Sequence, residues 1–254
     1  RKVSDRQFDQ ISLYWQTAAA VDTNGFLYMW GKTRPSAAVY SGGNREGNLF
    51  RGTVTSYTRM TPTQIPTTLS NGGNVTVADV KIGMDHVLVR DGNNLYGWGS
   101  NCEFQLTTNE NINGEKSTTD LQEIATDCAT HANSFVAGDS ATLYINTGGN
   151  VYGRGRYSDL MTAPSDSTQK IHALTNADQI FASKVHDYPF NTFVTLDNKN
   201  CFVWGHNCGF MSYEKDSVRG KREQDNALDG KTNSDFYLYD LEVSRPMYLG
   251  AFLT

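Results

Sequence analysis

The chain alternates short apolar runs with turns rich in Gly and Asn, and one such pattern occurs four times. Each copy has an apolar run, a turn of Asp, Asn or Gly, a second apolar run, and then an aromatic residue or Arg followed by Gly. The copies occupy residues 21–32, 89–99, 145–155 and 196–205. Turn residues that accept positive φ, placed between β-branched and aromatic runs, are typical of a β-hairpin. A hairpin cannot bury its own apolar face, so we expect its copies to lie beside it.

Further strand-like runs extend each hairpin to a meander of three to four short strands. The first strand of each unit is expected at residues 10–14, 77–82, 121–124 and 177–181, and the inner strand at 18–21, 87–89, 142–145 and 192–196. We therefore predict a single domain over 1–254. Its units are expected at 8–60, 61–119, 120–170 and 171–235, with 236–254 as a closing stretch.

Composition supports strands and turns. The 254 residues include 21 Asn, 26 Thr and 23 Gly, a bias that does not suit a helical bundle. A net charge of −5 gives no electrostatic footprint for nucleic acid, so no nucleic-acid partner is expected. No run has the length of a membrane span and no signal-peptide pattern opens the chain, so we expect a soluble protein. Because residue 1 is Arg, the compartment stays open.

The sequence offers little catalytic chemistry. It contains no Gly-x-Ser-x-Gly elbow, no phosphate-binding Gly-x-x-x-x-Gly-Lys loop and no His-Glu-x-x-His motif. Cys102 and Cys208 both follow a repeat Trp by four residues, which favours two buried small residues over a disulfide. A metal site at Cys201, His206 and Cys208 would lack the short paired ligand spacing of structural zinc sites. We therefore predict a protein that is not an enzyme, with no catalytic residue, cofactor or metal.

The second unit resembles the regulator of chromosome condensation repeat. The resemblance is carried by Gly83-Met84-Asp85-His86, Asp91-Gly92, Leu95-Tyr96-Gly97-Trp98-Gly99, Asn101 and Gln105-Leu106. The other three units are degenerate, and the third has Arg154 in place of Trp. The resemblance covers nearly the whole chain. It implies a β-propeller, and it implies that His86 forms hydrogen bonds within its blade.

Family members typically have seven blades, whereas this chain has room for four units. We expect an all-β propeller of about four blades, closed by pairing of the C-terminal stretch 236–254 with the first unit. The alternative is a partial propeller that is completed by another chain or by sequence not given.

Two groups of residues follow from the repeat. The expected structural group contains Trp30, Gly31, His86, Asp91, Gly92, Trp98, Gly99, Gly155, Trp204 and Gly205. Insertions in a repeat array fall in loops that commonly bind partners, so the long segments 32–60, 100–119 and 206–236 are the expected binding loops. The candidate interface residues are the loop tyrosines Tyr40, Tyr57, Tyr157 and Tyr213.

Three functions remain open at this point. The sequence favours a non-enzymatic interaction or structural module with protein partners, for example a subunit of a large assembly such as a virion or phage particle. The alternative, implied by the resemblance alone, is a guanine-nucleotide exchange factor for a small GTPase. A weaker alternative is a carbohydrate-binding module. The oligomeric state is not fixed by the sequence, although membership of a larger complex is expected.

The repeat assignment predicts where stability resides. Replacing Trp98 by Ala should cost about 3 to 5 kcal/mol of unfolding free energy, because a large ring packed between units is lost. Substitutions in the loop 32–60 should leave folding intact and alter binding. Urea denaturation measures the unfolding free energy of both kinds of variant. An unchanged transition for Trp98→Ala would show that the repeat assignment is wrong.

Overall fold

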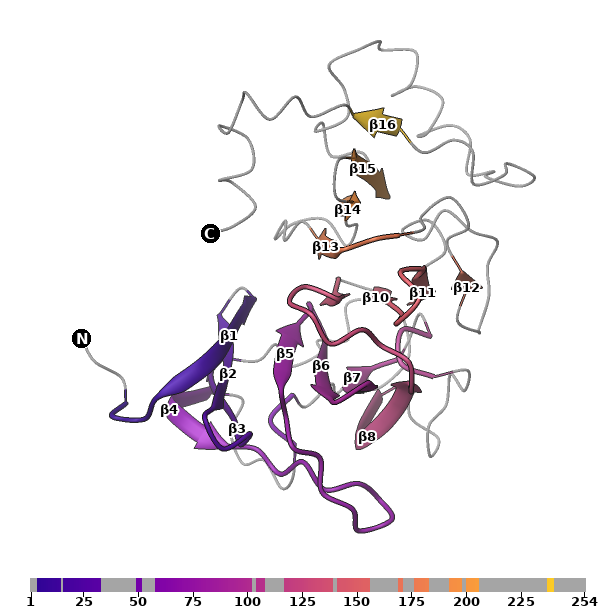
Figure 1. The fold of residues 1–254 in the computed structure, drawn as a ribbon. Coiled ribbons are helices and arrows are strands. Elements are labelled where there is room, and N and C mark those ends of the chain that lie inside the picture. Colours follow the sequence, from indigo (N-terminus) through magenta and orange to yellow (C-terminus); the bar gives the residue numbers. More distant parts are fainter. Residues whose placement is uncertain are drawn as a thin grey trace, which may run out of the picture.

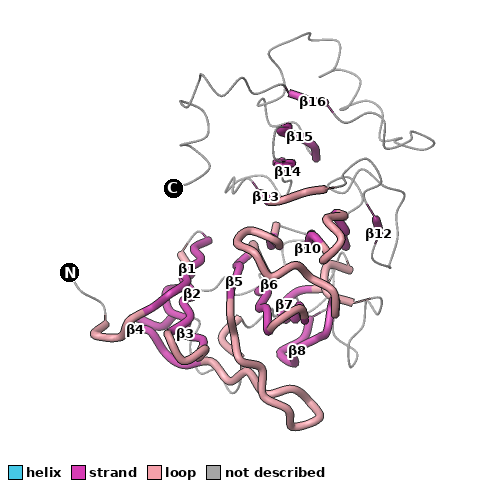
Figure 2. Tube along the Cα trace, in the orientation of Figure 1, coloured by secondary structure: helices cyan, strands magenta, loops and turns pink. Residues whose placement is uncertain are grey.

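The structure is a computed structural model that describes most of the predicted strands. The described residues are 4–14, 16–32, 49–51, 58–101, 104–107, 117–138, 141–155, 169–170, 176–182, 192–197, 200–205 and 237–239. Strands and loops, without any helix, make up this part of the chain (Figure 2).

The strands form four sheets, each a four-stranded antiparallel meander in chain order. In Figure 1 the sheets follow one another along the chain, from the indigo strands near the N-terminus to the yellow strand β16. The first sheet contains β1 (Phe8–Tyr14), β2 (Thr17–Asp22), β3 (Leu27–Lys32) and β4 (Thr58–Gln64). The second contains β5 (Asp79–Ile82), β6 (His86–Asp91), β7 (Asn94–Ser100) and β8 (Ser117–Ala125). The third contains β9 (Phe135–Ala137), β10 (Ala141–Ile145), β11 (Val151–Gly155) and β12 (Gln169–Lys170). The fourth contains β13 (Gln179–Ala182), β14 (Thr192–Asp197), β15 (Asn200–Gly205) and β16 (Tyr237–Tyr239).

Side-chain oxygens close two of the repeated hairpins. Asp22 Oδ1 accepts the backbone N–H groups of Asn24 and Phe26, each at 3.0 Å. Asn146 Oδ1 does the same for Gly148 and Asn150, also at 3.0 Å. Short polar side chains that bond to the backbone two and four residues later stabilise tight turns. The Asp and Asn of the repeat therefore act locally, within their own hairpins.

The glycine after the Trp or Arg of the repeat has a backbone that other residues rarely adopt. Gly31, Gly99 and Gly155 have φ of +97°, +111° and +115°. A Cβ at Gly99 would collide with the carbonyl oxygen of Asp85, and one at Gly31 with that of Gln16. This backbone favours glycine, and in the first two sheets it lies beside a shift in the pairing register between the third and the outer strand.

The cores lie between successive sheets. One apolar cluster joins the first and second sheets through Ala19, Val21, Val80 and Ile82 with fully buried Trp98. A second cluster joins the second and third sheets, and a third joins the third and fourth. The second and third sheets thus each bury both faces by contact with a neighbouring sheet, as in a repeat protein.

Two predicted boundaries are wrong. Residues 121–124 were expected to open the third unit, but they belong to β8, the outer strand of the second sheet. The third sheet instead begins with β9, which pairs with β10. The apolar run 121–124 precedes the third hairpin and therefore resembles a first strand, whereas β9 has only three residues and gives a weak pattern. Residues 58–64 likewise form the outer strand of the first sheet.

The predicted closing stretch also has a different partner where the structure describes it. Tyr237, Leu238 and Tyr239 pair with β15 and complete the fourth sheet. They occupy the outer-strand position that β4, β8 and β12 occupy in the other sheets. Pairing of 236–254 with the first sheet is not seen among the described residues.

The backbone at Gly99 gives a prediction with an internal control. Gly99→Ala should destabilise the protein by roughly 3 kcal/mol, because positive φ and a collision with the Asp85 backbone act together. Gly92→Ala should cost only about 1 kcal/mol, since φ is +55° but nothing lies within 4 Å of the added Cβ. Urea denaturation compares the two variants, and equal losses would contradict the proposed collision.

Candidate functional site

In the described part of the chain, several buried polar groups lie at the seams between sheets. A seam is defined here as the contact between two successive sheets. Trp98 of the second sheet is fully buried, and its indole Nε1 donates to the carbonyl of Leu49 at 3.0 Å. Leu49 lies between β3 and β4 of the first sheet, and the Arg51 guanidinium lies 5.7 Å from the centre of the Trp98 ring. The first sheet thus supplies the cover for the Trp of the second.

Arg154 makes the corresponding contact at the next seam. This residue has the Trp position of the third unit, and it is buried. Its Nη1 donates to the carbonyl of Leu106 at 3.4 Å, and Leu106 follows β7 in the second sheet. The guanidinium of Arg154 and the indole of Trp98 therefore have the same structural role, because each donates a buried N–H to a loop carbonyl of the preceding sheet.

Trp30 of the first sheet is covered from a different segment. The Phe8 ring stacks on it with a centroid distance of 6.2 Å and an interplanar angle of 27°. Phe8 also meets Tyr28 edge-on at 5.7 Å, and the Arg6 guanidinium lies 4.6 Å from the Tyr28 ring centre. Trp30 nevertheless remains partly exposed, unlike Trp98.

The His86 side chain forms its hydrogen bond with the third sheet, and not within its own sheet as the family resemblance implied. Its Nε2 lies 3.1 Å from Thr142 Oγ1 on β10, at hydrogen-bond distance. The ring is completely buried, and burial lowers the pKa of His86 to about 3. Among the described residues Nδ1 has no hydrogen-bond partner. His86 is therefore a neutral structural residue across the whole physiological pH range.

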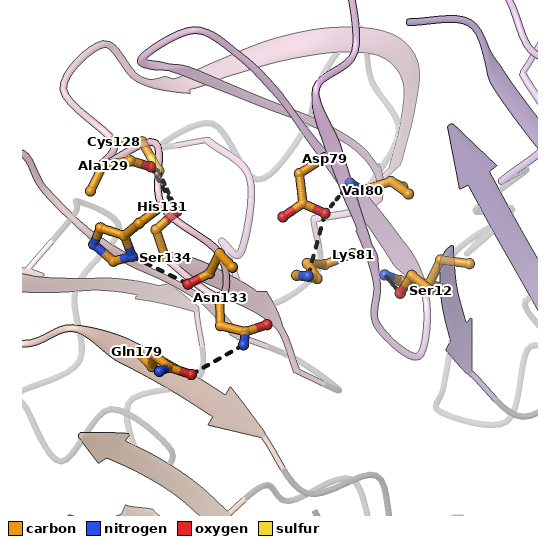
Figure 3. A network of polar contacts seen from close by, with 12 residues as sticks. Ser12, Asp79, Val80, Lys81, Cys128, Ala129, His131, Asn133, Ser134 and Gln179 are labelled. Carbon is orange, nitrogen blue, oxygen red and sulfur yellow. Dashed lines mark hydrogen bonds and ion pairs between the residues drawn. The ribbon is translucent and has the colours of Figure 1, made fainter. Parts of the chain in front are cut away.

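Further polar contacts cross the first seam and the seam between the third and fourth sheets (Figure 3). Ser12 Oγ on β1 accepts the backbone N–H of Ile82 on β5 at 2.9 Å. Between the third and fourth sheets, the Ile180 N–H donates to the Asn133 carbonyl at 2.9 Å, and Asn133 Nδ2 donates to Gln179 Oε1 at 3.3 Å. Each described seam is thus fixed in register by at least one hydrogen bond.

The buried thiol is unsuited to nucleophilic chemistry. Cys128 is a fully buried free cysteine whose Sγ lies 4.0 Å from Ser134 Oγ. Burial raises the pKa of the Cys128 thiol to about 12, which removes the reactive thiolate at neutral pH. Burial also raises the pKa of the Tyr144 hydroxyl. Within the described ranges no group of three His, Cys, Asp or Glu side chains could hold a metal ion.

The structure brings only part of the expected residues together. Asp91 Oδ2 accepts the Thr76 N–H at 3.1 Å, and Gly92 lies in the same hairpin turn with positive φ. Trp204 and Gly205 lie in β15, which places them in the fourth sheet. The loop residues fall outside the described part of the chain: Tyr40, Tyr57, Tyr157, Tyr213, Cys102, His206 and Cys208.

Sequence reasoning missed the partners of Trp98 and Arg154. Leu49 and Phe50 are an apolar pair inside a polar insertion, and both are buried. An apolar pair in a long polar loop could have been taken as a sign of contact with a neighbouring unit. No sequence signal pointed to Asn133, which bonds across a seam from a loop with φ of +57°.

No protein-family model and no curated protein sequence matches the chain. Solved structures do match. Yeast RCC1 (Prp20), crystallised bound to Kap60, superposes with a TM-score of 0.58 at 16% identity, covering 82% of this chain and 45% of that chain. Prp20p from Saccharomyces cerevisiae gives 0.57 at 16% identity over 80% and 46% of the two chains. Human WBSCR16 gives 0.50 at 12% identity over 80% and 63%.

These superpositions show an all-β fold of the RCC1 type of β-propeller. The chain spans a little under half the length of the two yeast chains it matches. No described helix is long and apolar enough to cross a membrane.

The buried state of His86 predicts a pH dependence. Its folded pKa of about 3 lies below the ordinary 6.5, so the unfolded chain binds an extra proton between these values. The stabilisation is complete above pH 6.5 and is lost as the pH falls. His86→Gln keeps a polar side chain that can reach Thr142 but does not titrate. Below pH 6.5 the wild type should lose up to about 1.4 kcal/mol per pH unit relative to this variant.

Urea denaturation of both proteins at pH 7.5, 6.5, 5.5 and 4.5 measures the difference. His131→Gln is the matched control, because His131 is exposed and should leave the slope unchanged. Parallel pH profiles for wild type and His86→Gln would contradict the assignment of a neutral buried imidazole.

Proposed function

We propose that this chain is a non-enzymatic propeller module that binds protein partners through its variable loops. The observation that carries the proposal is the use of the reactive side chains. His86 and Cys128 are fully buried in seam packing, and their pKa values are moved away from the range useful for catalysis at neutral pH. These two described groups serve as scaffold, and we therefore assign function to the segments between strands.

Loop length supports the same proposal. The hairpins are short and alike, whereas the segments that follow β3, β7 and β15 differ in length from unit to unit. Function in repeat proteins commonly resides in such insertions on one face. The loop tyrosines Tyr40, Tyr57, Tyr157 and Tyr213 are the proposed contact residues, since Tyr is enriched in protein interfaces.

Solved structures of similar fold provide a precedent for a protein partner. One yeast RCC1 structure contains Kap60, and the other was studied for its binding to Gsp1p and histones. Those partners belong to the yeast proteins, and at 16% identity only the fold is shared. A protein partner for this chain agrees with that precedent. Membership of a large assembly such as a virion or phage particle is a finer form of the proposal that rests on composition alone.

A guanine-nucleotide exchange factor for a small GTPase is the second candidate. The family resemblance of the second unit implies this activity, and the superposition on yeast RCC1 agrees with that resemblance. The present chain corresponds to less than half of that protein's length, so the surface available for exchange would be correspondingly smaller.

Capture of partners by the tagged 254-residue chain, followed by cross-linking mass spectrometry, tests the first proposal. The variants Tyr40→Ala/Tyr57→Ala and Tyr157→Ala/Tyr213→Ala should weaken the captured complex at least about tenfold, because interface tyrosines are frequent hot spots. Phe26→Ala is the matched control: this aromatic is 49% exposed but lies in a short repeat turn, so binding should persist.

Nucleotide release from a panel of small GTPases separates the two candidates. The interaction module should leave the release rates unchanged. Marked acceleration by the wild-type chain would overturn it in favour of the exchange factor. Cross-links that map to the short hairpin turns, with tyrosine variants as active as wild type, would contradict the role of the loops.

A further inference from the structure

The segment between the first and second sheets, residues 65–78, lies at the end of the sheets where the hairpin turns are. We call this segment the connector. β4 runs antiparallel to β3 and ends beside the start of β3, where the Ile65 N–H donates to the Leu27 carbonyl at 2.8 Å. Near the other end of the connector, the Val77 N–H donates to the Gly25 carbonyl of the first hairpin turn at 3.0 Å. Between these two attachments the connector extends beyond the sheets (Figure 1).

Hydrogen bonds within the connector hold two of its stretches side by side. The Val75 N–H donates to the Thr67 carbonyl at 3.0 Å, and Thr67 Oγ1 donates to the Val75 carbonyl at 2.8 Å. Thr68 and Asn74 form an antiparallel bridge, and Thr68 Oγ1 donates to Asn74 Oδ1 at 3.0 Å. The backbone around Asn74 therefore has an extended conformation that is fixed by the chain itself.

This extended stretch contains the acceptor pattern for an N-linked glycan. Asn74-Val75-Thr76 is the one Asn-x-Ser/Thr triplet among the 21 Asn of the sequence, and its middle residue is not Pro. Asn74 and Thr76 are exposed, whereas Val75 between them is 3% exposed. Because side chains alternate along an extended backbone, the amide of Asn74 and the hydroxyl of Thr76 face solvent on the same side.

The hydrogen bonds at this triplet use atoms other than those that glycosylation needs. Asn74 accepts the Thr68 hydroxyl through Oδ1, and Thr76 donates its backbone N–H to Asp91 Oδ2 at 3.1 Å. Among the described residues no hydrogen bond involves Asn74 Nδ2 or the Thr76 hydroxyl. An amide that is substituted on Nδ2 keeps its carbonyl oxygen as an acceptor. A sugar on Nδ2 would therefore leave the contact between Asn74 and Thr68 intact.

We propose that Asn74 is the acceptor of an N-linked glycan. The donor is a lipid-linked oligosaccharide diphosphate, and an oligosaccharyl transferase of the secretory pathway supplies the catalysis. Nδ2 of Asn74 attacks C1 of the first sugar, so that an N–C1 bond forms and the bond from C1 to the diphosphate oxygen breaks. The amide loses one proton, and the lipid diphosphate leaves. No oxidation or reduction is involved.

The glycan would lie away from the starts of two proposed binding loops. The segments that follow β3 and β7 begin after Lys32 and Ser100, at the ends of these strands that are farthest from the hairpin turns. Asn74 lies in the connector, which is attached at the turns. Glycosylation of Asn74 is therefore independent of which partner those loops bind.

Secretory expression of the 254-residue chain in insect cells, behind a cleavable leader, tests the acceptor. The wild type should carry one glycan, which intact mass measurement detects and peptide mass spectrometry places on Asn74. Peptide-N-glycosidase should release it. Asn74→Gln should abolish the modification, and so should Thr76→Val, which removes the hydroxyl but keeps a β-branched side chain. Thr76→Ser is the matched control, because it keeps the hydroxyl and should stay glycosylated.

Unmodified wild type in the medium would overturn the proposal. If the chain is retained inside the cells, the same masses are measured on the protein enclosed in secretory membranes, and an unmodified chain there would also overturn it. A glycan that persists in Asn74→Gln or in Thr76→Val would place the modification elsewhere and would contradict the assignment.

Urea denaturation tests whether the glycan leaves the connector intact. The glycosylated wild type and the same protein after peptide-N-glycosidase treatment should unfold at the same urea concentration, because no described contact of Asn74 is lost. A glycosylated protein that unfolds at clearly lower urea would contradict an acceptor whose Nδ2 is free in the folded chain.

Discussion

The contact between successive sheets is the interaction on which the rest of the structure depends. A four-stranded meander of this size has two apolar faces and too little interior of its own, so it is stable only when neighbours cover it. Apolar alternation supplies the attraction, and buried donors fix the position. Trp98 reaches Leu49 across one seam, and Arg154 reaches Leu106 across the next. An unsatisfied buried N–H would be costly, so each donor permits one placement of the neighbouring sheet.

This constraint also explains why two side chains that often take part in catalysis are unreactive here. His86 lies between two sheets, where burial keeps it neutral, and Cys128 lies in a core that keeps its thiol protonated. Both residues contribute to packing at the cost of reactivity. In a propeller of this kind the recognition surface can vary from loop to loop, while the interior must satisfy the same geometry in every unit.

Local features could be predicted from the sequence and contacts between units could not. Asp22 and Asn146 form their turns within four residues, and the four hairpins lie where the pattern placed them. The predicted start of the third unit lies too early in the sequence, because 121–124 has a stronger strand pattern than the three residues of β9. The expected bonding of His86 within its own blade was wrong, because its partner Thr142 lies 56 positions away on the third sheet. Repetition reveals that units adjoin, but the atoms that join them lie in segments that do not repeat.

At both of these seams the carbonyl acceptor comes earlier in the sequence than the donor that binds it. Leu49 precedes Trp98, and Leu106 precedes Arg154. This order has a consequence for how the chain folds during synthesis. A ribosome releases the earlier segment first, so the carbonyl acceptor already exists when the donor emerges. Each new sheet can therefore dock on a finished template without waiting for later sequence. A chain with this polarity grows from its N-terminal sheet outward, and few apolar faces need stand uncovered at any moment.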